Sequence, residues 1–106
     1  MSLSETTDFI RANSSDASVY EQLAEEATEL AQACLKKARV IRGESPTRVD
    51  SKSATTMIFE EYTDVSVVAH VLGLRVDSEA FSRKLERWAD RIDEFKLNNQ
   101  GRHGKI

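Results

Sequence analysis

The chain has 106 residues, which suits one domain and is short for two. Charged residues make up 31% and apolar residues 40%, and one Pro with four Gly leaves few obligatory breaks, so the composition favours an all-α protein. The net charge of −3 argues against a partner that is a nucleic-acid polymer, and no apolar run is long enough to span a bilayer. Because the single Cys34 cannot form an internal disulfide, we expect a cytoplasmic protein without membrane contact.

Residues 1–16 are expected to form an N-terminal arm or a short helix. Phe9 and Ile10 are large apolar residues in this segment, and Ser4 is a candidate N-cap. The stronger helical patterns begin after it, so we expect a helical domain over residues 17–97.

The first strong helical pattern covers residues 17–42. Asp16 or Ser18 can cap its N-terminus, and Gly43 fits the position that ends a helix. Apolar side chains recur at steps of three and four residues and are expected to line one buried stripe. These residues are Val19, Leu23, Ala27, Leu30 and Cys34.

A polar loop, residues 43–52, leads to a second strong pattern over residues 53–73. Its expected apolar stripe consists of Ile58, Tyr62, Val65, Ala69 and Leu72. Because Val67, Val68 and Val71 lie off this stripe, the helix is apolar over a wide arc and should be buried on more than one side. In a chain this short, that pattern indicates an interface with a second copy.

The last helical pattern covers residues 78–96, with Ser78 favoured over Asp77 as its cap. Its apolar stripe consists of Phe81, Leu85, Trp88, Ile92 and Phe95. The remaining residues, 98–106, show no periodicity and are expected to form a flexible tail. The three long helices should therefore pack as an all-α bundle whose four-helix core is completed by dimerisation.

Two short stretches, residues 25–30 and 60–65, share one pattern: two acids, a spacer, Thr, an acid and an aliphatic residue. Acids three residues apart share a face of a helix. On each helix the second and third acids lie roughly 60° and 120° to the same side of the apolar stripe. Glu26 and Glu61 should therefore border the core, where a carboxylate is costly unless it is paired or bound to metal.

Either stretch alone is typical of an ordinary solvated helix, because Glu is a good helix former. The repetition of the same acids, spacing and offset on two helices is harder to explain in that way. The second stretch also has no basic residue four positions after its acids: Asp64, Val65 and Val68 follow Glu60, Glu61 and Asp64. The pattern therefore favours two helices that contribute carboxylates to one Mg²⁺ site.

Glu25-Glu26-x-x-Glu29, followed some thirty residues later by Glu61-x-x-Asp64, resembles the signature of the MazG-like all-α nucleoside triphosphate pyrophosphohydrolases. The resemblance covers about residues 17 to 95 and includes a basic helix after the two half-motifs. It implies a hydrolase that converts an NTP or dNTP and water into a monophosphate and pyrophosphate, with a housecleaning role in the nucleotide pool. It also implies a homo-oligomer, either a dimer or a dimer of dimers.

The same resemblance implies a role for individual residues. Glu26, Glu29, Glu61 and Asp64 match the ligands of Mg²⁺, for which Mn²⁺ could substitute. Glu25 matches an acid that assists catalysis. Lys84 and Arg87 resemble basic residues that bind the substrate phosphates.

Two departures from the family pattern bear on which nucleotide is the substrate. Ser82 stands where many relatives carry an Asn, and the segment between the half-motifs is long. Two other classes of protein remain open. One is a non-enzymatic, dimeric helical interaction module with surface acids. The other is a di-iron carboxylate bundle, which is disfavoured because the chain has no Glu-x-x-His.

Overall fold

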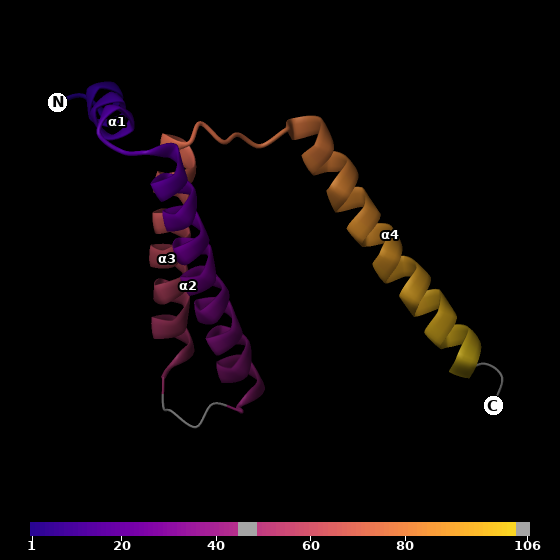
Figure 1. Cartoon of the computed structure of the whole chain (residues 1–106). Helices are drawn as coiled ribbons and strands as arrows, with labels where there is room; N and C mark the ends of the chain where they lie inside the picture. The colour runs from indigo at the N-terminus through magenta and orange to yellow at the C-terminus, as the bar shows by residue number, and fades with distance from the viewer. Residues whose placement is uncertain (45–48, 104–106) are drawn as a thin grey trace. The chain divides into compact units, whose positions relative to one another are not determined.

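The structure is a computed structural model that describes residues 1–44 and 49–103, with side chains through residue 99. The described residues form four helices: α1 (Leu3–Ala12), α2 (Asp16–Arg42), α3 (Ser51–Val71) and α4 (Ser78–His103) (Figure 1). No strand occurs among the residues described, which confirms the all-α prediction. The chain divides into two compact units, Met1–Arg75 and Val76–Ile106.

Side-chain caps fix where α1 and α2 begin. Ser2 caps α1: its hydroxyl accepts from the Glu5 amide at 3.1 Å, and the Glu5 carboxylate accepts from the Ser2 amide at 3.2 Å. Ser15 caps α2 by accepting from the amide of Ser18 at 3.2 Å. Both caps differ from the predicted ones, Ser4 for α1 and Asp16 or Ser18 for α2. Each true cap precedes its helix, where its side chain can reach the free amide three residues on.

Aspartates cap the other two helices. The Asp50 carboxylate accepts from the Ser53 amide at 2.7 Å, so α3 starts at Ser51. The Asp77 carboxylate accepts from the Ala80 amide at 3.0 Å, so Asp77 rather than Ser78 caps α4. As predicted, Gly43 ends α2, in the left-handed region at φ +71° that glycine adopts without steric cost.

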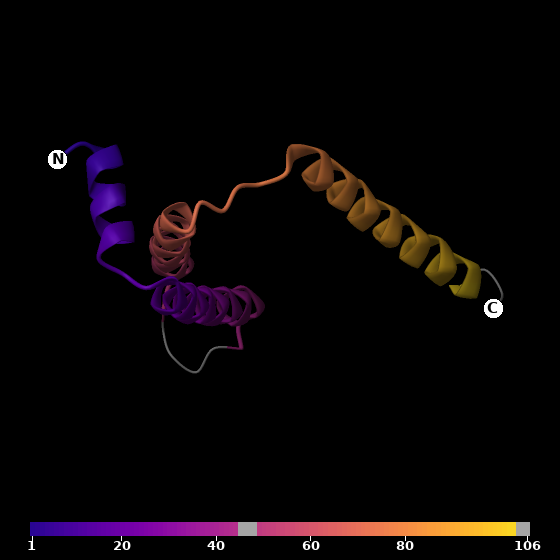
Figure 2. The same ribbon diagram turned by 45° about the horizontal axis from the view of Figure 1, so that its top comes forward.

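The helices α2 and α3 lie side by side and run in opposite directions (Figures 1 and 2). Their facing side chains recur at steps of three and four, as in a coiled coil, and are called the seam. On α2 and α3 the seam consists of Val19, Leu23, Glu26, Leu30, Ala33, Lys37 and Val40, and of Ala54, Ile58, Glu61, Val65, Val68 and Leu72. Val19, Ala33, Ala54 and Val68 are buried, and the others are half-buried.

The seam differs from the predicted stripes at several positions. Cys34 is exposed and its neighbour Ala33 is buried. Tyr62 is 61% exposed, and its neighbour Glu61 takes the half-buried position. A step of three or of four is allowed from Leu30 and from Ile58, so Cys34 and Tyr62 fit the spacing as well as Ala33 and Glu61 do. The observed seam includes Glu26 and Glu61, which a search for apolar residues alone leaves out.

Polar contacts tie the rest of the first unit together. The Thr7 hydroxyl lies 3.1 Å from His70 Nε2, and the Arg11 side chain donates to the carbonyls of Val71 at 2.8 Å and His70 at 3.2 Å. These contacts hold α1 against the C-terminal end of α3. At the other end of the pair, Lys37 Nζ donates to the Ser51 carbonyl at 2.7 Å.

The helix α4 continues to His103, beyond the predicted end at residue 96, so the first part of the predicted tail is helical. Residues 104–106 and residues 45–48 of the predicted loop lie outside the described part of the chain. The apolar stripe of α4 is exposed, including Trp88 at 64%. Within the described ranges, no helix combines the length and the apolar character needed to cross a membrane.

Candidate metal centre

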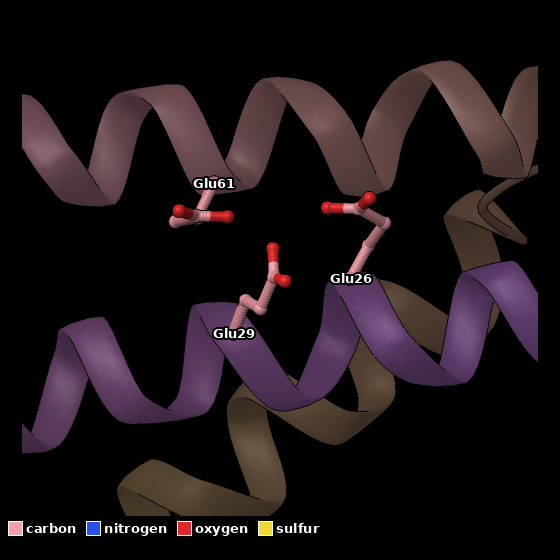
Figure 3. A group of neighbouring side chains, drawn as sticks. All are labelled: Glu26, Glu29 and Glu61. Carbon is pink, nitrogen blue, oxygen red and sulfur yellow. The ribbon is translucent and has the colours of Figure 1, made fainter.

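Three glutamates meet between α2 and α3. Glu26 and Glu29 extend from α2 and Glu61 from α3, and all three side chains point into the space between the two helices (Figure 3). Each offers one carboxylate oxygen, and these oxygens lie within 4.8 Å of one another. The seam spacing explains the convergence, because Glu26 and Glu61 occupy positions that face the partner helix.

Glu26 and Glu61 are half-buried within the seam, whereas Glu29 is exposed at its edge. The Oε2 atoms of Glu26 and Glu61 are buried and accept no hydrogen bond. A buried carboxylate oxygen that has lost water without gaining a partner destabilises the fold. A bound cation is the simplest partner that would satisfy both atoms at once.

The pKa values of Glu26 and Glu61 are both raised above the ordinary value of a glutamate. Desolvation is the largest cause for both Glu26 and Glu61, followed by repulsion from Glu29. For both residues, hydrogen bonding to Glu29 raises the pKa further, because it stabilises the protonated form. The site therefore attracts positive charge, either as protons or as a cation.

Asp64 lies close to this group without belonging to it. It is exposed, and it is not among the residues whose oxygens lie within 4.8 Å of one another. Its charge nevertheless raises the pKa of both Glu26 and Glu61. Three of the four predicted metal ligands thus come together, and the fourth lies near enough to act on two of them.

The remaining acids of the two motifs are peripheral. Glu25 and Glu60 are exposed and lie outside the group of three, although the charge of Glu60 raises the pKa of Glu61. Glu25 was predicted to assist catalysis, and its position is that of an accessible carboxylate next to Glu26 in the chain.

The predicted phosphate-binding residues belong to the second unit. Lys84 and Arg87 lie one turn apart on α4 and, with Trp88 and Arg91, line a hollow of about 410 Å³. Glu26 and Glu61 were predicted at the border of the core, whereas both lie within the seam. The missed signal is that the three-and-four spacing runs without interruption from Leu23 through Glu26.

No family model, curated protein or solved structure matches this chain.

The three carboxylates fit a hard divalent cation. Carboxylate oxygen is the ligand type that Mg²⁺ and Mn²⁺ prefer, whereas zinc sites usually contain His or Cys. Exposed acids often gather without binding an ion, but here two of the three are half-buried and each has a buried oxygen without a partner. A cation held between α2 and α3 would account for both features.

Proposed function

We propose that the protein is a Mg²⁺-dependent nucleoside triphosphate pyrophosphohydrolase of the MazG-like type. The observation that carries the proposal is the convergence of Glu26, Glu29 and Glu61, with two buried oxygens that lack partners. The proposed reaction converts an NTP or dNTP and water into a monophosphate and pyrophosphate. The resemblance of the two acidic motifs to that superfamily supports the choice of reaction.

In this proposal Glu26, Glu29 and Glu61 hold the cation, and Asp64 completes the ligand set. When bound, Mg²⁺ supplies positive charge that activates water and neutralises phosphate oxygens. Four carboxylates without a cation would repel a triphosphate, so the acids alone make a poor site for this substrate.

The other proposed roles follow from side-chain chemistry. Glu25 is accessible and can accept the proton of the attacking water. Lys84 and Arg87 bind the phosphates, because ammonium and guanidinium groups make charge-assisted hydrogen bonds to phosphate oxygens. We further propose that the protein acts as a dimer or a dimer of dimers in the cytoplasm, where it removes unwanted nucleotides.

A pyrophosphate-release assay tests the proposed function. Purified protein is incubated with canonical and modified NTPs and dNTPs, with Mg²⁺ or with EDTA. We expect release from at least one triphosphate in Mg²⁺ alone, and a loss of about 100-fold in Glu61→Gln. Glu21→Gln, at an exposed position of α2 outside the group of three, is the control and should keep its activity. Cleavage of no triphosphate, or undiminished cleavage by Glu61→Gln, would exclude the proposal.

A non-enzymatic helical interaction module is the second candidate, and the exposed apolar side chains favour it. On the first unit, Tyr20, Ile41 and Tyr62 are each more than half exposed, and the apolar stripe of α4 is exposed as well. Such surfaces are typical of protein interfaces. This candidate predicts that Tyr62→Ser weakens self-association while Glu61→Gln does not, with both measured by sedimentation.

A further inference from the structure

A cleft of about 730 Å³ lies between α1 and α3. Thr7 and Arg11 hold α1 to the end of α3 through hydrogen bonds to His70 and Val71. Because this attachment is polar, α1 is fixed in place without its apolar side chains closing onto α3. The cleft is therefore preformed, and its volume is in the range of small-molecule sites.

The walls of the cleft are apolar despite their many hydroxyl groups. Leu3, Ile10, Val67 and Val71 supply hydrocarbon directly. The hydroxyls of the lining threonines and of Ser66 donate their hydrogens to backbone carbonyls four residues earlier in the chain. These bonds belong to Thr6, Thr7, Thr63 and Ser66. The body of a ligand would therefore meet a mainly hydrocarbon surface.

The charged side chains in the lining give the cleft a net positive charge. Arg11 and Arg75 contribute two guanidinium groups, and Asp8 contributes one carboxylate. Arg11 is held rigidly because Nε and one Nη donate to the carbonyls at the end of α3. A guanidinium has five N–H donors, so Arg11 keeps others for an anion.

We propose that this cleft binds a free medium-chain carboxylate, with its alkyl chain along Val67 and Val71 and its anionic head at the arginines. An apolar helix of a second copy fits less well. The exposed apolar stripe of α4 is bordered by Lys84 and Arg91, which would be brought against Arg11 and Arg75. Like charges at an interface disfavour such a complex.

Backbone NMR with octanoate as the probe tests the proposal on the full chain, and 1-octanol serves as the uncharged comparison. We expect saturable shifts of the amides of α1 and of residues 63–75, with a Kd below about 1 mM for octanoate. The alcohol should bind about tenfold more weakly, because it lacks the charge-assisted contact to guanidinium. Absence of saturable octanoate shifts in these segments would overturn the proposal.

Two matched pairs of variants locate the ligand. Val67→Asp places a carboxylate in the apolar wall and should abolish octanoate binding, whereas Val76→Asp, at an exposed valine outside the lining, should not. Arg75→Gln should reduce octanoate affinity part of the way toward that of 1-octanol, because Arg11 remains, while Arg42→Gln should leave it unchanged. Equal binding within either pair contradicts the assignment. A wild-type dimer that excludes octanoate and dissociates in Val67→Asp would show that a second copy fills the cleft instead.

Discussion

Two parts of the α2–α3 seam follow one spacing but contain opposite chemistry. The buried apolar positions are Val19, Ala33, Ala54 and Val68. The same three-and-four spacing places Glu26 and Glu61 at other positions of the seam. The apolar positions stabilise the helix pair by removing hydrocarbon from water. The glutamate positions do the reverse, since each buries an oxygen without a partner. A fold that keeps charge in its seam sacrifices stability there, which is a common property of functional sites.

The largest expected effect concerns metal affinity and separates the acids by position. Glu61→Gln removes a half-buried carboxylate from the group of three and should weaken Mn²⁺ binding by about 100-fold. Asp64→Asn removes an exposed charge nearby and should cost about tenfold. Glu60→Gln, next to Glu61 in the chain but outside the group, is the control and should stay near the wild-type value. Titration with Mn²⁺, followed by electron paramagnetic resonance, measures the Mn²⁺ affinity of all three variants. Equal affinities of the three variants would contradict a single site formed by these carboxylates.

The apolar part of the seam is tested by stability. Val68→Ala, at a side chain that is 6% exposed, should lower the free energy of unfolding by about 2 kcal/mol, through lost burial and a residual cavity. Val67→Ala, at the adjacent position that is 56% exposed, should change it by less than about 0.5 kcal/mol. Urea unfolding followed by circular dichroism gives both values. Equal losses would mean that the seam register is wrong or that a second copy covers Val67.

In the absence of metal, the glutamate part of the seam should make the stability of the protein depend on pH, whereas the apolar part should not. The pKa values of Glu26 and Glu61 are raised above their ordinary value of 4.5 in the folded protein, so the folded state binds these protons more tightly than the unfolded chain. Their contribution to stability is therefore complete below pH 4.5 and is lost as the pH rises through the raised pKa values.

The double variant Glu26→Gln and Glu61→Gln isolates this contribution. In EDTA, the wild type should lose stability relative to the double variant as the pH rises from 4 to 7, as measured by the free energy of unfolding of each protein. Added Mg²⁺ should reverse the trend, because the cation stabilises the ionised carboxylates. A difference that stays constant with pH would show that the two carboxyls titrate as they do in the unfolded chain.

The helical class of the protein followed from the sequence, and three of the four acids predicted as ligands come together, but the register of α2 against α3 did not follow. Helix type followed from the apolar periodicity, and the ends of α2 and α3 were predicted to within two residues because Gly43 and Gly73 leave few choices. Register could not be determined because Cys34 and Tyr62 fit the three-and-four spacing as well as Ala33 and Glu61 do. Only the packing of α2 on α3 selects between them, and that contact is non-local.

The smallest expected effect tests that register at Cys34. The predicted apolar stripe places this thiol in the core, whereas the structure leaves it exposed next to the buried Ala33. A thiol reagent should therefore label Cys34 in the native protein as fast as in urea, since no unfolding is required. Cys34→Ser should change the free energy of unfolding by less than about 0.5 kcal/mol, because an exposed hydroxyl replaces an exposed thiol. Slow labelling that accelerates on dilution would indicate that a second copy covers α2 on this side. Slow labelling at every protein concentration would show that Cys34 lies in the seam.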